Sequence, residues 1–170
     1  MRPVLVLAAA SALTFAAPAA AQELTPNPDI DYAGFLQLTG DVAEHREARL
    51  IPWADFIEQA RQGDAILLDT RSAAAFEAGH IKGAINLPFS DFTDAKLAKV
   101  IGDFDRPIYI YCNNNFTDGI EPVATKRAPL ALNIPTYINL YGYGYEQVFE
   151  MADQVTIEDL GEDWVSGFVG

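Results

Sequence analysis

Cysteine and histidine are both scarce in this chain. Its 170 residues contain one cysteine, Cys112, and two histidines. A single cysteine cannot form a disulfide within the chain, so the fold must be stabilised by its hydrophobic core. No cysteine or second histidine stands at metal-ligand spacing from His45. We therefore expect no metal site, and we interpret His45 as a solvated surface residue.

Basic residues are also scarce, and this excludes several kinds of partner. The chain has 11 lysine and arginine residues against 24 acidic ones, a net charge of −13. Such a balance repels nucleic acid and anionic membrane surfaces. We expect no nucleic-acid partner. The charge also gives an anionic substrate no long-range attraction.

One long apolar run is present, at residues 4–17, and it is interrupted by Ser11 and Thr14. It follows Arg2 and precedes an A-x-A ending at Ala21, the pattern of a secretory signal peptide. The run is shorter than the ~20 residues needed to span a bilayer. We predict a signal peptide at residues 1–21 and a bacterial protein that is secreted or periplasmic, with no membrane association after cleavage.

Cleavage after residue 21 would leave a mature chain of 149 residues, the size of a single domain. Only one basic residue is lost with the leader, so ten basic and 24 acidic side chains remain, a net charge of −14. Residues 22–49 form an N-terminal extension. Within it, residues 22–31 contain two prolines and no periodicity and are expected to be a tether. Residues 33–38 are predicted to be a short strand, and residues 41–49 are charged and ambiguous.

Strand and helix patterns alternate after residue 50. Apolar runs predict strands at 65–68, 84–87, 108–111 and 136–140, and 3.6-residue periodicity or capping residues predict helices at 52–62, 73–78, 90–101, 122–132 and 145–152. Strands separated by helices pair in parallel. The expected fold is an α/β sandwich with its site at the carboxyl ends of the strands.

The lone cysteine stands at such a strand end. Cys112 follows the apolar run 107–111 and opens the loop 113–119, rich in asparagine. This is where α/β folds place a reactive group. The alternative is a buried structural cysteine, because free cysteine often behaves as a small inert hydrophobe.

Two motifs in the middle of the chain give a family resemblance. The first is Leu67-Leu68-Asp69-Thr70-Arg71, and the second runs from Phe76-Glu77-Ala78-Gly79-His80 to Leu87-Pro88. Together they resemble the signature of the rhodanese-like family, a strand ending in D-x-R followed by G-H-I-x-G-A-x-N-hydrophobic-P. Asn139-Leu140-Tyr141-Gly142 is similar to the family's N-L-x-G element. The resemblance covers residues 50–152 and leaves an acidic tail, 153–170, which we expect to pack back onto the domain.

The resemblance implies a rhodanese-like three-layer sandwich with a mostly parallel central sheet. It also implies that Cys112 carries sulfane sulfur as a persulfide, taken from a donor and passed to an acceptor that is a small thiol or a protein, without a cofactor. Asp69 and Arg71 would support the site. For this pair a purely structural role, as a buried hydrogen-bonded pair, stays open. His80 is interpreted as a structural hydrogen-bonding residue.

The loop after Cys112 departs from the family's pattern. Active rhodaneses usually follow the cysteine with a short loop bearing arginine or lysine and glycine, and related phosphatases use C-x5-R. Here the loop consists of Asn113, Asn114, Asn115, Phe116, Thr117, Asp118 and Gly119. The position six after the cysteine is therefore acidic, and no basic residue occurs before Lys126. A phosphatase is disfavoured, and weak thiosulfate transfer is expected, because the loop contains no cation that could bind a phosphoryl group or thiosulfate.

Some stabilisation of a thiolate remains possible. The loop is expected to form a nest of N–H groups facing the sulfur. A helix starting near Pro122 would add its dipole, and Lys126 would reach back to the loop. Two functions stay open: a sulfurtransferase or persulfide carrier, and a non-catalytic interaction module that uses the loop and the tyrosine-rich run 141–145. A carrier requires an accessible thiol of low pKa.

Overall fold

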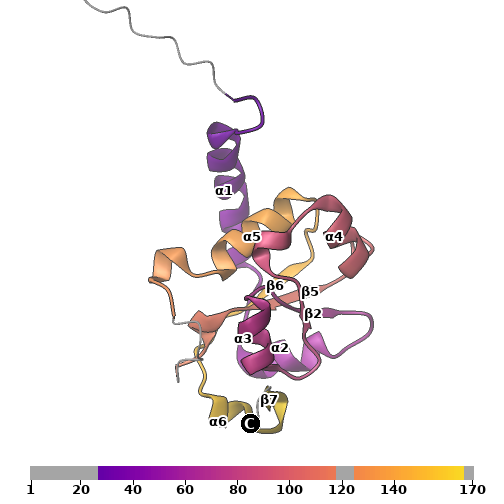
Figure 1. The fold of residues 1–170 in the computed structure, drawn as a ribbon, viewed down its shortest axis with the longest axis vertical. Helices are drawn as coiled ribbons and strands as arrows, with labels where there is room; N and C mark the ends of the chain where they lie inside the picture. Colours follow the sequence, from indigo (N-terminus) through magenta and orange to yellow (C-terminus); the bar gives the residue numbers. More distant parts are fainter. Residues whose placement is uncertain (1–26, 118–124, 167–170) are drawn as a thin grey trace, which may run out of the picture. The chain divides into compact units, whose positions relative to one another are not determined.

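Five parallel strands form the central sheet of the computed structural model, which describes residues 27–117 and 125–166 (Figure 1). The strand order is β1-β6-β5-β2-β4, and each neighbouring pair is parallel. The strands are β1 (Leu50–Ile51), β2 (Ile66–Asp69), β4 (Ile85–Asn86), β5 (Ile108–Tyr111) and β6 (Val148–Met151). The predicted α/β fold with a mostly parallel sheet is confirmed.

The register of the two central strands determines which side chains enter each half of the core. Ile66 pairs with Ile108 and Leu68 with Ile110, and these residues face one side of the sheet. Tyr109 belongs to the core on the opposite side, because successive strand residues point to opposite faces. Apolar side chains on both faces explain why β2 and β5 lack polar alternation.

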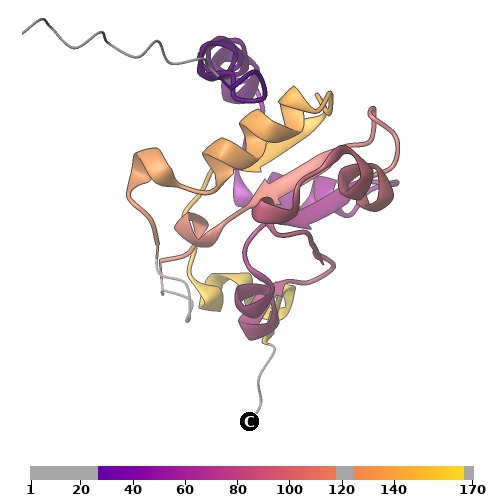
Figure 2. The same ribbon diagram turned by 45° about the horizontal axis from the view of Figure 1, so that its top comes forward.

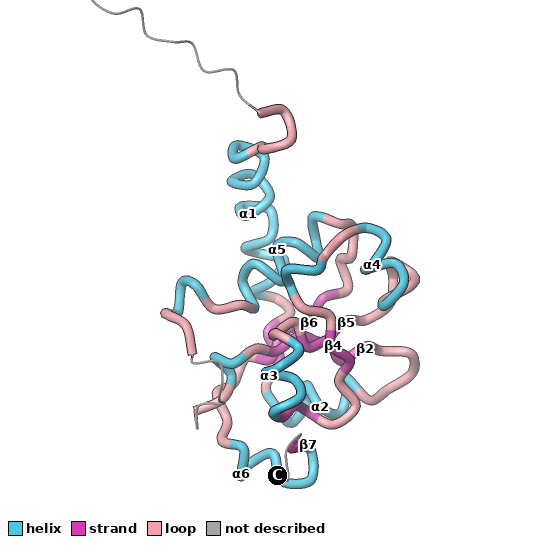
Figure 3. Tube along the Cα trace, viewed as in Figure 1, coloured by secondary structure: helices cyan, strands magenta, loops and turns pink. Residues whose placement is uncertain are grey.

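Three helices cover the first face (Figures 1 and 3), and Figure 2 shows α1 (indigo) and α5 (orange) on this side of the sheet from a second direction. They are α1 (Tyr32–Glu47), α4 (Asp94–Val100) and α5 (Asn133–Gly142). Each contributes buried side chains to one apolar cluster, among them Val42, Leu97, Tyr137 and Leu140. Thr93 caps α4, so the predicted helix 90–101 is divided into a 3-10 turn at Phe89–Asp91 and α4.

The second face is covered by α2 (Trp53–Ala60), α6 (Ile157–Leu160) and a small second sheet. After α3 (Ala73–Ala78), strand β3 (Gly79–Ile81) pairs antiparallel with β7 (Trp164–Ser166). A Cβ atom on Gly79 would lie 2.4 Å from the Trp164 side chain, so glycine permits this close packing. The expected packing of the tail onto the domain is therefore present as far as the described residues reach.

The N-terminal prediction of a strand at 33–38 is wrong, because these residues belong to α1. Val42 of this helix is buried in the core cluster, and Leu38, one turn earlier, packs against that cluster. Most of the other helix positions are exposed or half-buried. The helix is thus stabilised by tertiary contacts with the domain that a local hydrophobic pattern does not reveal. From residue 32 onward the chain forms one compact unit that includes α1.

The last two predicted elements have the wrong type. Residues 136–140 lie within α5, where Thr136 and Tyr137 stand four and three residues before Leu140, so that all three are buried on one side of the helix. Their β-branched and aromatic composition favours a strand only in the absence of this context. Residues 145–152, predicted as a helix, contain strand β6, whose place between β1 and β5 is set by pairing.

Several predictions concern residues outside the described ranges. These are the signal peptide at 1–21, Asp118 and Gly119 in the loop, and Pro122 as a helix start. The described part of the predicted helix 122–132 is not α-helical, because it contains only a 3-10 turn at Ala128–Leu130. None of the described helices combines the length and apolar character needed to cross a bilayer.

Candidate functional site

The carboxyl ends of two neighbouring strands bring the predicted site residues together. Cys112 follows β5, and Asp69 is the last residue of β2, where it pairs with Tyr111 in the sheet register. After β2 the chain adds β4 on one side, and it later adds β5 on the other. A reversal of this kind opens a crevice at the carboxyl ends of the strands.

Asp69 and Arg71 form a buried ion pair. Arg71 Nε lies 3.0 Å from each carboxylate oxygen of Asp69, and Nη2 lies 2.6 Å from Oδ2. Nη2 also donates to the carbonyl of Gly79, and Nη1 donates to Asn113 Oδ1 at 3.2 Å. Burial acts to lower the pKa of the guanidinium, but the hydrogen bonds and charge of Asp69 outweigh it and the pKa is raised.

The hydroxyl of Tyr111 completes this cluster. It donates to Asp69 Oδ2 at 2.7 Å and accepts from the backbone N–H of Ile81 at 3.1 Å. Burial, followed by the charge of Asp69, raises the pKa of this phenol well above its usual range. Its geometry is that of a buried, hydrogen-bonded pair, the structural role that the sequence left open for Asp69 and Arg71. Through Arg71 the cluster also contacts the loop after Cys112. His80 is also a hydrogen-bonding residue, since its Nδ1 lies 2.9 Å from the carbonyl of Phe76.

The Cys112 thiol is buried, with 1% of the residue exposed. Burial is the largest influence and raises the pKa of the thiol. The backbone N–H groups of Asn114, Asn133 and Leu132 act in the opposite direction, because they bond to the sulfur and favour its anion. The carboxylate of Glu150 adds to the increase, and the net pKa lies above the usual value.

These N–H groups come from two segments that are far apart in the sequence. Asn114 lies in the 3-10 turn Asn113–Asn115, directly after Cys112. Leu132 and Asn133 stand at the start of α5, whose first N–H groups have no partner within the helix. Among the described helices, the one that directs its positive end at the sulfur is therefore α5.

The asparagine side chains hold the loop in place. Asn115 Oδ1 accepts from the backbone N–H of Cys112 at 2.9 Å, while its Nδ2 donates to the carbonyls of Met151 and Asp153. Asn114 exchanges two hydrogen bonds with the backbone of Lys126, at 2.7 and 3.0 Å. An amide carries a donor and an acceptor together, so three consecutive asparagines can satisfy backbone groups of several segments. This role was not predicted from the sequence.

Two charged residues near the thiol were also missed. Glu150 on β6 is 4% exposed and accepts two hydrogen bonds from Arg46 on α1. The distances are 2.5 Å from Nε to Oε2 and 2.7 Å from Nη2 to Oε1. Asn133 Nδ2 donates to the same carboxylate at 3.1 Å. The only trace of this site in the sequence is an acidic residue inside an apolar strand.

The interpretation of His45 as a solvated surface residue is wrong. Its Nδ1 lies 2.9 Å from the hydroxyl of Tyr137, which donates its proton to the carbonyl of Val148. Since the hydroxyl has only one proton, Nδ1 of His45 must be the donor. Burial, followed by the charge of Arg49, lowers the pKa of this imidazole. His45 therefore helps to attach α1 to α5.

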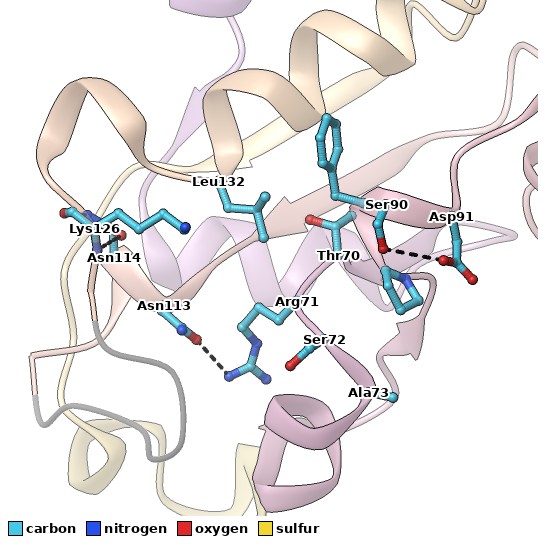
Figure 4. Close-up of a pocket in the computed structure, with 12 residues that line it drawn as sticks. Thr70, Arg71, Ser72, Ala73, Ser90, Asp91, Asn113, Asn114, Lys126 and Leu132 are labelled. Carbon is cyan, nitrogen blue, oxygen red and sulfur yellow. Dashed lines mark hydrogen bonds between the residues drawn. The ribbon is translucent and has the colours of Figure 1, made fainter.

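Two cavities flank the Cys112 loop. The larger, about 440 Å³, is lined by residues that follow β2, including Arg71, and by Asn113, Asn114, Lys126 and Leu132. Figure 4 shows the Lys126 side chain extending into this cavity and Arg71 bonded to Asn113. The smaller, about 310 Å³, is lined in part by Arg46, Asn114, Asn133 and Glu150. Cys112 lines neither of them, and Asn114 lines both.

In the described ranges no three histidine, cysteine, aspartate or glutamate side chains converge in the manner of a metal site. The polar groups around the thiol are instead backbone N–H groups and one carboxylate, Glu150, which is paired with Arg46. This arrangement can hold an anionic sulfur by hydrogen bonds. Among the described residues, the groups that act on the sulfur include no arginine.

Comparison with known proteins gives short but informative matches. The chain is 36% identical over 63 residues to the HTH-type transcriptional regulator Rv0324 of Mycobacterium tuberculosis, covering 37% of this chain and 26% of that protein. It is 41% identical over 64 residues to the uncharacterized protein YqhL of Bacillus subtilis, covering 36% of this chain and 48% of the relative. The chain thus spans between a quarter and a half of these relatives.

Solved structures with similar folds include two rhodanese-like proteins. The solution structure of the rhodanese-like domain of the Alr3790 protein from Anabaena is 18% identical, with a TM-score of 0.47, covering 69% of this chain and 79% of that domain. A rhodanese from E. coli, solved with anions, is 20% identical with a TM-score of 0.39, covering 60% of this chain and 98% of the other.

The family assignment rests on a longer match. The rhodanese-like domain family matches residues 53–152, which is more than half of the chain. This range includes the sheet from β2 to β6, the Asp69–Arg71 pair and Cys112. It ends before the tail strand β7 and begins after α1. The chain therefore belongs to the rhodanese-like domain family.

Proposed function

We propose that the protein is a sulfurtransferase or persulfide sulfur carrier in which Cys112 bears the transferred sulfur. The observation that supports this most is that hydrogen bonding from the backbone N–H groups of Asn114, Leu132 and Asn133 acts to lower the pKa of the Cys112 thiol. Such groups stabilise an anionic sulfur without a cation. Membership of the family supports sulfur transfer as the general chemistry.

The proposed reaction exchanges one sulfur–sulfur bond for another. The Cys112 thiolate attacks the outer sulfur of a persulfide donor, R–S–SH. The donor's S–S bond breaks, R–S⁻ leaves with the electron pair, and the outer sulfur with its hydrogen remains on Cys112. In the second step an acceptor thiolate attacks that outer sulfur and Cys112 leaves as a thiolate. Neither step changes the total oxidation state, so no cofactor is required.

The donor is proposed to be a persulfide of a small thiol or of a protein. The chain's charge of −13 repels a small dianion. Lys126 is the cationic side chain that extends into the larger cavity, while Arg71 is already paired with Asp69. We therefore expect thiosulfate to be a poor donor compared with a persulfide.

The proposal can be tested by the mass of the intact protein after exposure to a persulfide of a small thiol. We expect the wild-type chain to gain the mass of one sulfur atom, and Cys112→Ser to gain none. Because Cys112 is the sole cysteine, no other thiol can contribute. A wild-type chain that remains unmodified after long exposure would contradict the proposal. Efficient sulfur transfer from thiosulfate to cyanide would contradict the proposed choice of donor.

A non-catalytic interaction module is the second candidate, and one observation favours it. Cys112 is 1% exposed and its pKa is raised, whereas a carrier requires access and a thiolate. The tyrosine-rich run gives this candidate less support than expected, because Tyr145 is buried and Tyr141 and Tyr143 pack against the core. An interaction module would tolerate Cys112→Ser without loss of partner binding.

Export is a separate proposal that rests on the sequence of residues 1–21. We propose that the mature protein begins at Gln22 and is secreted or periplasmic, because the N-terminal pattern is that of a cleaved leader. Mass spectrometry of the N-terminal peptide of the protein from its native host is expected to find Gln22 as the first residue, as glutamine or as its cyclised form. A native protein that begins at Met1 would overturn the proposal.

A further inference from the structure

We propose that Arg46, on helix α1 and outside the family match, is a positioning residue for Cys112. Its ion pair with Glu150 would hold the loop amides in place and neutralise a buried carboxylate whose charge acts on the thiol. This inference rests on the proposed function of Cys112 as the sulfur-bearing residue. It extends the site to a helix that precedes the family domain by several residues.

A continuous series of hydrogen bonds connects Arg46 with the backbone of Cys112. Arg46 binds both oxygens of Glu150, and Asn133 Nδ2 donates to Glu150 Oε1. The same Nδ2 donates to Asn115 Oδ1 at 3.0 Å, and Asn115 Oδ1 accepts from the Cys112 N–H. Displacing Glu150 would therefore release Asn133 and weaken the support of Asn115.

The orientation of both amides is determined by their partners. Asn133 Nδ2 faces two oxygens, so it must be the donor end. Asn115 Nδ2 faces the carbonyls of Met151 and Asp153, which leaves Oδ1 toward the N–H of Cys112. Neither side chain can be rotated by half a turn without placing like groups together. The series thus has one arrangement.

Arg46 also matters for charge. The carboxylate of Glu150 disfavours a thiolate at Cys112, as a negative charge next to a thiol does in general. Among the other charged groups near the strand ends, Asp69 and Arg71 neutralise each other. Lys126 lies at the larger cavity, on the side of the loop away from Glu150. Arg49 donates to the carbonyl of His45 and lies over the Phe149 ring. Among the described residues, Arg46 is therefore the cation that forms an ion pair with Glu150 and offsets its charge.

Helix α1 is attached firmly enough to present Arg46. Val42, one turn before Arg46, is buried in the core cluster, and His45 donates to the hydroxyl of Tyr137. The guanidinium remains about one third exposed, so its removal opens space for water and leaves Glu150 without its bidentate partner. Exchange of Arg46 for lysine keeps the charge but loses the two-pronged geometry.

The test is a double-mutant cycle read out on the only thiol of the chain. The protein is labelled with cysteine carrying ¹³C at Cβ, and the single resonance is followed against pH in wild type, Arg46→Gln, Glu150→Gln and the double variant. We expect Arg46→Gln to raise the pKa of Cys112 and Glu150→Gln to lower it. Alkylation of Arg46→Gln by iodoacetamide at pH 7 should slow about threefold, the size expected for a partly exposed charge pair.

The double variant shows whether Arg46 acts on the thiol through Glu150 or directly. If Arg46 acts through Glu150, adding Arg46→Gln to Glu150→Gln should leave the thiol titration unchanged, whereas a direct effect of Arg46 would persist. Arg46→Lys should recover part of the wild-type titration. Arg61→Gln is the matched control, because it removes a surface ion pair with Asp163 and should not affect the thiol.

Three results would overturn the inference. They are an unchanged thiol titration in Arg46→Gln, an equal shift in the Glu150→Gln background, and the same shift in Arg61→Gln. Should Arg46→Gln fail to fold, Arg46→Lys and Glu150→Gln alone keep the test open, since they must shift the titration in opposite directions. The titration uses no sulfur donor. A protein that accepts no sulfur but titrates as expected would refute the proposed function and support the role of Arg46.

Discussion

Two polar clusters flank Cys112, and they bury a carboxylate in different ways. The β2 cluster consists of Asp69, Arg71 and Tyr111, and the Glu150 cluster of Arg46, Glu150, Asn133 and Asn115. In the β2 cluster both charged side chains are at most 1% exposed and lie two residues apart in the sequence. In the Glu150 cluster the arginine comes from 104 residues away and is 32% exposed.

This difference indicates different roles. The β2 cluster is built around the Asp69–Arg71 pair of the family's signature motif and is fully buried. Arg71 also donates to Gly79 and Asn113, so the cluster stabilises the strand end on which the loop rests. The Glu150 cluster is assembled from α1, α5 and β6 and reaches the backbone of Cys112. A change in the first should mainly affect folding, and a change in the second should mainly affect the thiol.

The largest effect is expected from Asp69→Ala. It would leave the guanidinium of Arg71 buried without its counter-ion, which costs about 3–5 kcal/mol of unfolding free energy. Urea denaturation followed by circular dichroism measures this value. The control is Asp163→Ala, whose pair with Arg61 is partly exposed and should contribute at most about 1 kcal/mol. If the two variants lose similar amounts of unfolding free energy, the β2 cluster stabilises the fold no more than the Arg61–Asp163 pair does.

Glu150→Ala should destabilise the protein less, by about 2 kcal/mol. The reason is that Arg46 is partly exposed and can then turn toward water, whereas Arg71 is buried and cannot reach water. The same denaturation experiment gives the comparison with Asp69→Ala. If Glu150→Ala proves the more destabilising variant, the Glu150 cluster rather than the β2 cluster supports the fold.

The pH dependence of Cys112 should report its burial. Because the pKa of the thiol is raised, alkylation should continue to accelerate at pH values where a free cysteine, with a pKa of about 8.5, has levelled off. The folded state also prefers the neutral thiol. Its contribution to stability is complete below the pKa of the unfolded thiol and is lost as the pH rises through the higher folded value.

Wild type and Cys112→Ser should therefore differ in how their unfolding free energies change at alkaline pH. Wild type should lose more stability as the pH rises. Subtracting the two curves removes the effect of Tyr111, whose pKa is also raised. Parallel curves, or alkylation that levels off like that of a free thiol, would mean that Cys112 is more accessible to water than its 1% exposure indicates.

The smallest effect is expected from Lys126→Ala. Lys126 extends into the larger cavity, so it should favour an anionic reagent over a neutral one (Figure 4). We expect the ratio of the iodoacetate rate to the iodoacetamide rate to fall about twofold, because an exposed charge is screened by solvent and salt. Lys99→Ala on α4 is the control. An unchanged ratio would show that reagents reach Cys112 without passing the larger cavity.

Local sequence was sufficient where local rules determine the structure. The strand 108–111 was predicted residue for residue, since an apolar run between proline and Cys112 admits few other structures. The helix 73–78 was also predicted with both of its ends, which the structure caps with Ser72 and Gly79. The placement of Asp69 and Arg71 beside Cys112 also followed, because the carboxyl ends of parallel strands share one edge of the sheet.

The remaining features depend on contacts between distant segments. Residues 136–140 have a strand-like composition, but they form a helix because their buried side chains recur every three or four residues against the sheet. The Arg46–Glu150 pair joins residues on α1 and β6 that no spacing rule connects. The N–H groups of α5 at the sulfur were missed for the same reason, since twenty residues separate Cys112 from Leu132.

The central claim, that Cys112 accepts and releases sulfur, is tested most directly by one complete transfer cycle. The protein is exposed to a small persulfide, separated from it, and then mixed with an acceptor thiol while the intact mass is followed. We predict that every chain gains one sulfur atom and then returns to its starting mass as the acceptor persulfide appears. A chain that never gains sulfur, or that retains it in the presence of the acceptor, would contradict the account.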